Sequence, residues 1–265
     1  MFGGWRRAIA ASLLAGCGLT ACSPSRRPTS ARVTTTTVSS TTALPASSPT
    51  TGVTSTPAGG PQSSPTTTAT PAAPTECINP ADNLLMNGDG EAAPPAEDEV
   101  ARVAVPSWTL TGAATTFAYD ASGPTRTESG VPDAGRAMFA GGPGQALSTF
   151  TQSVDIAPAA TGEPFVAAAC LGGFLGQADA TTMSVAFLDA AGTPVGAPLP
   201  TVTATAADRH KSNSFVVRSI LGTVPSGARH ASVVLTMRRV EGAYNDGYAD
   251  NVSLRLPSGG GRPAL

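Results

Sequence analysis

The stretch Phe150-Thr151-Gln152-Ser153-Val154-Asp155-Ile156 alternates along its length, with Phe150, Val154 and Ile156 on one side. Successive side chains of a β-strand point to opposite faces, so this pattern predicts a strand with one face in a core and the other in water. The stretch is too short, and its period too close to two, for an amphipathic helix.

Other short runs rich in Val, Phe, Thr and Leu recur between clusters of Gly, Pro, Asp and Asn. No window shows a helical stripe of useful length, so the sequence predicts an all-β chain, an antiparallel β-sandwich of the jelly-roll type. Asp189 to Gly192 and Asn245-Asp246-Gly247 are expected to be turns. The nine expected strands are 83–86, 108–110, 115–119, 146–156, 165–171, 182–188, 214–220, 231–238 and 249–256.

A segment of quite different composition precedes these runs. Between Ser23 and Thr75, 35 of 53 residues are Thr, Ser or Pro, and none is acidic or aromatic. Such a segment cannot offset the entropy of ordering by burying apolar surface, and its prolines favour extended conformations. We therefore expect a disordered Thr/Ser/Pro-rich stalk, a composition that is also typical of O-glycosylated stalks.

The N-terminus has the layout of an export signal, with Arg6 and Arg7 ahead of a short apolar run. The run Leu19-Thr20-Ala21-Cys22 behind it resembles the lipobox of bacterial lipoproteins. The resemblance implies cleavage before Cys22 and acylation of that residue by diacylglycerol and a fatty acid such as palmitate. It places the chain on the extracytoplasmic face of the cell membrane. The expected organisation is a signal peptide over 1–21, a lipid-anchored linker over 22–75, the β-sandwich over 76–257 and a flexible tail over 258–265.

Two cysteines remain once Cys17 leaves with the signal peptide and Cys22 takes the lipid. Cys77 and Cys170 would then share an oxidising compartment, where we expect them to form a disulfide. Closing so long a loop would stabilise the domain by roughly 4 to 5 kcal/mol in the chain-entropy model. The alternative is a pair of buried free thiols.

All 18 acidic residues lie from Glu76 onward, against 11 basic residues there, which gives the folded part a net charge of −7. A negative surface repels phosphate backbones, so the sequence argues against a nucleic-acid partner.

The two ends of the domain carry a second resemblance. Asn83-Leu84-Leu85-Met86-Asn87-Gly88-Asp89-Gly90-Glu91 opens it, and Tyr248-Ala249-Asp250-Asn251-Val252-Ser253-Leu254 closes it. Together with Val105-Pro106-Ser107-Trp108 between them, these motifs resemble the galactose-binding-like jelly-roll superfamily, which includes many carbohydrate-binding modules. The resemblance departs at Gly90, where the family usually has an aromatic residue.

The resemblance implies a structural calcium ion between the first and last strands, with Glu91 and Asp250 at the matching positions. Calcium takes six to eight oxygen ligands, so backbone carbonyls of the 87–91 loop would have to complete the shell. The alternative is that both side chains cap turns. If calcium is bound, chelation is expected to lower the melting temperature by several degrees.

The resemblance also implies a carbohydrate ligand, held by aromatic faces and by polar groups that bond its hydroxyls. The candidate ligand-binding residues are Trp108, Tyr119, Arg238, Tyr244 and Tyr248. Trp108 has a core position as its alternative, and Tyr248 could simply cover the end of the sheet.

Catalysis finds little support in the sequence. His210 and His230 are the only histidines, and the motifs of serine hydrolases and zinc enzymes are missing from the chain. Asp208-Arg209-His210 is interpreted as a solvated loop. We therefore expect a non-catalytic binding module on a cell-envelope lipoprotein, with carbohydrate as the implied ligand. The alternatives are a protein-interaction or structural lipoprotein without a glycan ligand, and a secreted hydrolase whose site the motifs do not reveal.

Overall fold

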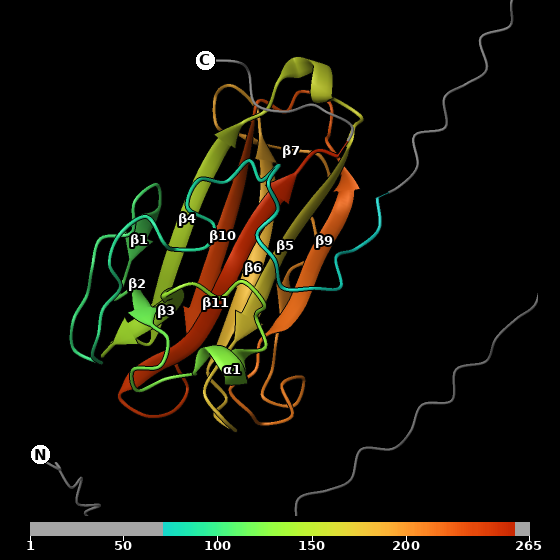
Figure 1. The fold of residues 1–265 in the computed structure, drawn as a ribbon. Coiled ribbons are helices and arrows are strands. Elements are labelled where there is room, and N and C mark those ends of the chain that lie inside the picture. The colour runs from blue at the N-terminus through green and yellow to red at the C-terminus, as the bar shows by residue number, and fades with distance from the viewer. Residues whose placement is uncertain (1–70, 258–265) are drawn as a thin grey trace, which may run out of the picture. The chain divides into compact units, whose positions relative to one another are not determined.

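The computed structural model describes residues 71–257, and they form a sandwich of two antiparallel β-sheets (Figure 1). The all-β prediction is thereby confirmed. Signal peptide 1–21, Cys22, most of the 22–75 linker and tail 258–265 lie outside the described residues. No helix within 71–257 combines the length and the apolar character needed to span a bilayer.

The first sheet, here sheet I, has the strand order β1-β4-β10-β6-β7, and β8 also pairs with β6. Its strands are β1 (Thr109–Thr111), β4 (Leu147–Asp155), β10 (His230–Arg238), β6 (Ala180–Leu188), β7 (Pro194–Val195) and β8 (Val202–Thr203).

The second sheet, sheet II, has the order β2-β3-β11-β5-β9. Its strands are β2 (Thr115–Ala118), β3 (Ala137–Pro143), β11 (Tyr244–Arg255), β5 (Pro164–Gly172) and β9 (Val216–Thr223). The helical elements of the described part are short, namely the α-helix α1 (Arg126–Ser129) and the 3-10 helix η1 (Pro158–Ala160).

Sheet I follows the alternation expected from the sequence. In β4, Phe150 is fully buried while Ser153 and Asp155 are exposed, and β6 and β10 show the same inside–outside pattern. The expected turn at Asp189 is also present, because the Asp189 amide donates to the Thr193 carbonyl and Gly192 has a positive φ of 81°. One face of sheet I packs on sheet II and the other meets water.

The main core lies between the sheets and contains an edge-to-face cluster of aromatic rings. Trp108 lies 5.3 Å from Phe139, and Phe139 lies 5.1 Å from Phe150, measured between ring centroids. Trp108 is only 7% exposed, and its indole nitrogen donates to the Asn87 carbonyl at 3.0 Å. Trp108 thus takes the core position that was the alternative for it: its ring packs in the core, and its one polar atom is bonded internally.

Sheet II is buried on both faces, which the alternation rule did not anticipate. All nine residues of β5 are buried, and β11 is buried along most of its length. The segment that leads into β1 and the loops around α1 cover the outer face. Beneath them lies a second hydrophobic cluster, here the outer core, formed by Cys77, Ala96, Phe117, Tyr119, Val131, Met138, Ala140, Cys170, Phe215, Tyr244 and Tyr248.

Three strand assignments from the sequence need correction. Residues 83–86 form turns rather than a strand, although the Leu84 amide donates to the Leu254 carbonyl and Leu85 is buried. Strand β3 was missed, because its sequence Ala-Met-Phe-Ala-Gly-Gly-Pro has few β-branched residues. The expected turn at 245–247 lies inside β11, where the pairing register shifts between Asn245 and Tyr248.

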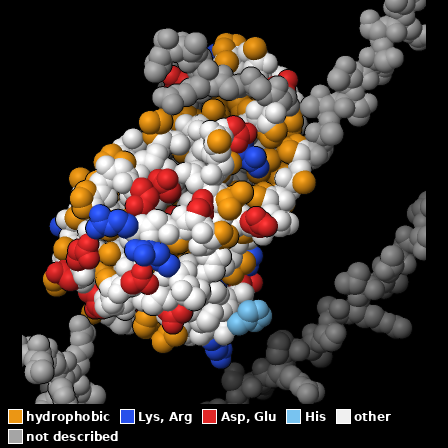
Figure 2. All heavy atoms as spheres, viewed as in Figure 1, with side chains coloured by type: hydrophobic (Ala, Val, Ile, Leu, Met, Phe, Trp, Pro, Cys, Tyr) orange, Lys and Arg blue, Asp and Glu red, His pale blue; other side chains and the backbone are white. Residues whose placement is uncertain are grey.

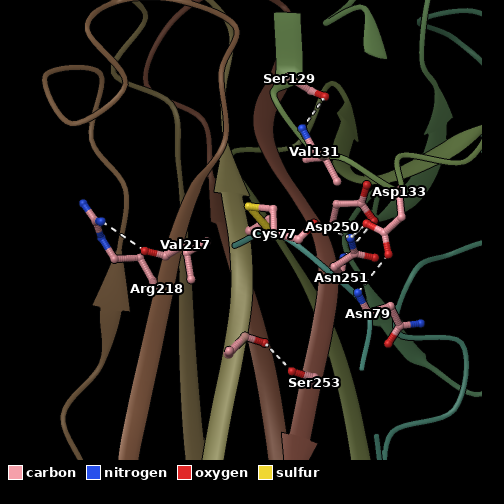
Figure 3. Close-up of a disulfide and its surroundings, with 12 residues drawn as sticks. Cys77, Asn79, Ser129, Val131, Asp133, Val217, Arg218, Asp250, Asn251 and Ser253 are labelled. Carbon is pink, nitrogen blue, oxygen red and sulfur yellow. Dashed lines mark hydrogen bonds between the residues drawn. A yellow bond between two sulfur atoms is a disulfide. The ribbon is translucent and has the colours of Figure 1, made fainter. Parts of the chain in front are cut away.

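Cys77 and Cys170 form the expected disulfide, with their Cα atoms 5.5 Å apart (Figure 3). The bond joins the segment at the start of the described chain to the central strand β5. Asn251 strengthens the same junction, since its side-chain amide donates to the Cys77 carbonyl at 3.2 Å and to Asp133 at 2.6 Å. The covering segment is thus attached to sheet II both covalently and by hydrogen bonds.

Replacing Cys77 by serine should lower the free energy of unfolding by about 2 to 5 kcal/mol, because the unfolded chain gains freedom when the 93-residue link is lost. Urea unfolding measures the change. Cys170→Ser and the double variant should show the same loss as Cys77→Ser. Additive losses from the two single variants, or two reactive thiols in the native protein, would contradict a disulfide.

Candidate ligand-binding site

A pocket of about 210 Å³ opens on the outer side of sheet II, above the start of β11. We call it the β11 pocket. Its walls come from β2, β11, the loop after β2, the loop between β5 and β6, and the segment ahead of β1. The lining residues are Glu99, Phe117, Ser122, Gly123, Phe174, Gln177, Gly242, Ala243, Tyr244, Asp246 and Tyr248.

The register shift in β11 shapes the floor of this pocket. Asp179, which is fully buried, accepts the backbone amides of Val240, Glu241 and Asp246 at 2.6, 2.9 and 2.9 Å. The side chain of Asn245 donates to the Met237 carbonyl at 3.0 Å. These bonds satisfy backbone groups that would be paired in a regular strand ladder but are unpaired at the irregularity. They also fix the position of Asp246 at the pocket.

Asp246 is the most perturbed acid of the pocket. Its Oδ1 accepts the hydroxyl proton of Tyr248 at 2.5 Å. Burial raises the pKa of Asp246 to about 6, and the nearby negative charges of Asp179 and Glu99 add to this effect, while the bond from Tyr248 opposes it. The folded protein therefore holds the carboxylate of Asp246 in a place where its ionised form is less stable than in water.

Two polar atoms of the pocket residues are buried without a partner. The hydroxyl of Tyr244 and the Oε1 of Gln177 form no hydrogen bond within the described part of the chain. Burial, and then the charge of Asp246, raises the pKa of Tyr244 above its usual value, so the phenol stays neutral and able to donate. A buried polar atom left unpaired costs roughly 1 to 3 kcal/mol, which a bound ligand could recover.

A buried arginine organises one wall of the pocket. Arg209 is fully buried, and its guanidinium donates to the carbonyls of Gly173, Leu175, Gln177 and Ser212. It thereby holds the loop that carries Phe174 and Gln177. The interpretation of 208–210 as a solvated loop is wrong for Arg209, because a polar neighbourhood in sequence does not reveal a cage of carbonyls.

The structure brings together two of the five predicted ligand-binding residues, Tyr244 and Tyr248. Tyr119 donates its hydroxyl to Asp250 at 2.7 Å and does not line the β11 pocket. Arg238 ends β10 at an exposed position outside the pocket lining. Tyr119, Arg238 and Trp108 lie outside the β11 pocket, and their roles in ligand binding stay predictions of the sequence.

Sequence reasoning missed most of the pocket. Phe117, Phe174, Gln177 and Asp246 come from three separate regions of the chain. The only signal in the sequence was the position of Asp246 between two tyrosines, and it was interpreted as part of a turn.

The proposed calcium residues lie in a hydrogen-bonded network. Asp250, which is 2% exposed, accepts the hydroxyl of Tyr119 and the amide of Asn251, and Glu91 accepts the amides of Arg136 and Ala137, both at 2.7 Å. Within 71–257 no group of three or more metal-ligating side chains is found. As arranged here, the side chains do not form a calcium shell, and calcium stays a prediction of the sequence.

A second hollow of about 480 Å³ lies at the edge of the sandwich, between β6, β7 and the chain that follows β9. Its lining is mainly apolar and includes Phe187, Val195, Leu199 and Pro225. No charged side chain lines it, so it offers little to orient a polar ligand.

One histidine has an acidic partner. His230 Nδ1 lies 2.9 Å from Asp155 Oδ1 where β10 pairs with β4, and both side chains are well exposed. Within the described residues the pair makes no hydrogen bond to a serine, threonine or cysteine side chain, so it lacks the nucleophile that a hydrolytic triad requires.

No protein-family model matches the chain, and no curated protein does. Among solved structures, the chain is similar to the enzymatically active domain of tailspike protein 4 of bacteriophage CBA120, with 22% identity, a TM-score of 0.43 and coverage of 66% of this chain and 21% of that one. It thus spans about a fifth of that protein.

Two carbohydrate-binding modules are also similar to the chain. One is TmCBM61, solved in complex with beta-1,4-galactotriose, with 14% identity, a TM-score of 0.41 and coverage of 66% of this chain and 98% of that one. The other is the C-terminal family 22 module of Clostridium thermocellum Xyn10B, with 16% identity, a TM-score of 0.39 and coverage of 67% and 96%. No pocket residue is assigned from these similarities.

The perturbed pKa of Asp246 predicts a pH-dependent stability. The folded pKa of about 6 lies above the ordinary value of 3.8, so folding loses stability as the pH rises from about 4 to 6. Asp246→Asn removes this loss and should raise the free energy of unfolding by about 1 to 2 kcal/mol at pH 7, allowing for solvent screening, and by little at pH 4.

Denaturant unfolding of the wild type and the variant at both pH values measures this difference. Glu97→Gln is the control, because Glu97 lies in the same acidic region but is well exposed. An equal gain at pH 4 and pH 7, or a gain of the same size in the control, would contradict the assignment to Asp246.

Proposed function

We propose that this protein is an extracytoplasmic, lipid-anchored binding module that holds a small saccharide in the β11 pocket and does not transform it. The observation that carries the proposal is the composition of the pocket. Aromatic rings, unpaired hydrogen-bonding groups and a carboxylate held at a cost in stability all converge on one hollow. Proteins keep such costly groups chiefly where function needs them.

The aromatic part of the lining suits the apolar faces of a sugar ring. Phe117 and Tyr244 pack with their ring centroids 5.6 Å apart at an angle of 45°, and Phe174 and Tyr248 complete the aromatic part of the lining. Phe174 is the most exposed of the four, so it is the ring best placed to stack on a ligand.

The polar part of the pocket suits hydroxyl groups. Asp246 and Gln177 offer acceptors, and Tyr244 offers a donor. At about 210 Å³ the pocket is smaller than the roughly 300 to 1,000 Å³ typical of sites for drug-sized ligands, so it fits one ring or the end of a chain.

The cellular setting is part of the proposal and rests on the sequence. Acylation of Cys22 would hold the protein at the membrane, since several acyl chains together anchor durably. A stalk rich in proline would hold the pocket away from the lipid surface, where envelope or external glycans can reach it.

A second candidate follows from the apolar hollow of about 480 Å³ at the edge of sheet I. Such a surface would suit an apolar side chain of a protein partner, as expected of a protein-interaction lipoprotein. The same experiment tests both candidates.

The test is a glycan array probed with the full mature chain, followed by calorimetric titration of the glycans that bind. Phe174→Ala should weaken binding about tenfold, because stacking on one aromatic ring is worth about 1 to 1.5 kcal/mol. Val195→Ala, which changes the apolar hollow instead, should leave glycan affinity unchanged.

Silence across the array would contradict the proposal and favour the protein-interaction candidate. Glycan binding that Val195→Ala weakens and Phe174→Ala does not would move the site to the apolar hollow. The melting temperatures of both variants establish that each is folded.

A further inference from the structure

We propose that the β11 pocket selects a saccharide that carries a positively charged amino group. This inference rests on the proposed function and adds the chemical class of the ligand. The pocket brings together two acids, Glu99 and Asp246, and its lining contains no Lys, Arg or His. A neutral sugar would leave that negative charge uncompensated.

The carboxylate of Asp246 has no cationic partner. Within the described residues, the carboxylate accepts one hydrogen bond, which the hydroxyl of Tyr248 donates to Oδ1. None of the salt bridges found there involves Asp246. A half-buried carboxylate without a countercharge is stabilised most by a cation that enters its pocket. The structure leaves Oδ2 of Asp246 free to receive one.

The groups that face Asp246 are all neutral or negative. Tyr244 and Tyr248 lie on its own strand, Asp179 lies just ahead of β6, and Glu99 comes from the segment before β1. The acids around Asp246 therefore add to the attraction for a positive charge. The nearest guanidinium groups, those of Arg209 and Arg239, lie behind the lining and donate to the carbonyls of Gln177 and Gly242.

The unpaired tyrosine is an independent sign that a ligand belongs here. Tyr244 is only 7% exposed, and its hydroxyl has no hydrogen-bond partner in the part of the chain that the structure describes. Burial, and then the charges of Asp246, Glu99 and Asp98, raise the pKa of Tyr244, so its hydroxyl lies near both acids of the lining. It can bond a ring hydroxyl of the same ligand whose amine meets Asp246.

An ammonium group matches the remaining features of the lining. It carries three donors, which suit Asp246 Oδ2 and the unpaired Oε1 of Gln177 together. Phe174, the most exposed ring of the lining, can attract a cation through its ring quadrupole. A neutral N-acetyl group gains neither the charge pairing nor the cation–π attraction.

The wider charge distribution acts in the same direction. From Glu76 to Pro257 the chain has 18 acidic and 10 basic residues, and the face viewed in Figure 2 carries acidic side chains beside a few basic ones. A negative field raises the local concentration of a cationic ligand and speeds its association.

The test compares β-1,4-linked glucosamine oligosaccharides with N-acetylglucosamine oligosaccharides of the same length. Both are titrated calorimetrically into the full mature chain at pH 6.5 and low salt. The amine form should bind at least tenfold more tightly, and added salt should reduce this preference because it screens the charges.

Asp246→Asn should weaken binding of the amine form about tenfold and change that of the N-acetyl form less than twofold. The control Glu97→Gln removes one negative charge outside the pocket and should change neither affinity by more than twofold. Asp246→Asn is expected to be more stable than the wild type, so unfolding does not account for its loss of binding.

Equal affinities, or a preference for the N-acetyl form, would overturn the inference and leave the proposed saccharide function standing. No binding of either form would also overturn the inference alone. Binding of the amine form that Phe174→Ala leaves intact would overturn both. A tenfold preference that Asp246→Asn abolishes would support both.

Discussion

The burial of sheet II on both faces is the constraint on which the rest of the structure depends. Strands β5 and β11 form the centre of this sheet, and β11 makes hydrogen bonds to both β3 and β5. Their inner faces meet sheet I in the main core, and their outer faces meet the outer core. Because a buried sheet face must be covered by other parts of the chain, the segment before β1 and the loops around α1 have to be held in place.

Two kinds of attachment hold that cover. The disulfide between Cys77 and Cys170 fastens its beginning covalently to β5. Hydrogen bonds do the rest, since Asn251 of β11 donates to the Cys77 carbonyl and to Asp133. Arg209 and Asp179 hold the neighbouring loops in the same way, with bonds to four carbonyls and three amides. Loop backbone under a cover needs such partners, since water cannot reach it. The β11 pocket lies where the cover leaves the outer core open. There the hydroxyl of Tyr244 and the Oε1 of Gln177 are buried without a hydrogen-bond partner.

The quality of the sequence predictions differs between the sheets for a physical reason. Sheet I has one wet face, so alternation in β4 identified both the strand and its buried side, Phe150 included. The central strands of sheet II have no wet face and lack that signal; β3 was missed and the beginning of β11 was interpreted as a turn. The other strands of sheet II were expected from their composition, whereas the two-residue strands β7 and β8 of sheet I were missed because they are too short to show a pattern. The pocket residues were likewise found only where the sequence carries a signal. Tyr244 and Tyr248 were found because aromatic residues are rare in this chain, whereas Phe174, Gln177 and Asp246 carry no pattern that sets them apart.

The sequence by itself determined the class of the fold and predicted the pairing of its two domain cysteines. Each of these follows from composition or from a period along the chain, which are local quantities. Only the tertiary structure decided which aromatic residues fill a core and which line a pocket. Trp108, Tyr119 and Tyr248 look alike in the sequence, yet Trp108 packs against Phe139, Tyr119 bonds Asp250 and Tyr248 bonds Asp246. The role of each ring depends on contacts between residues far apart in the chain, and the residue type alone does not contain that information.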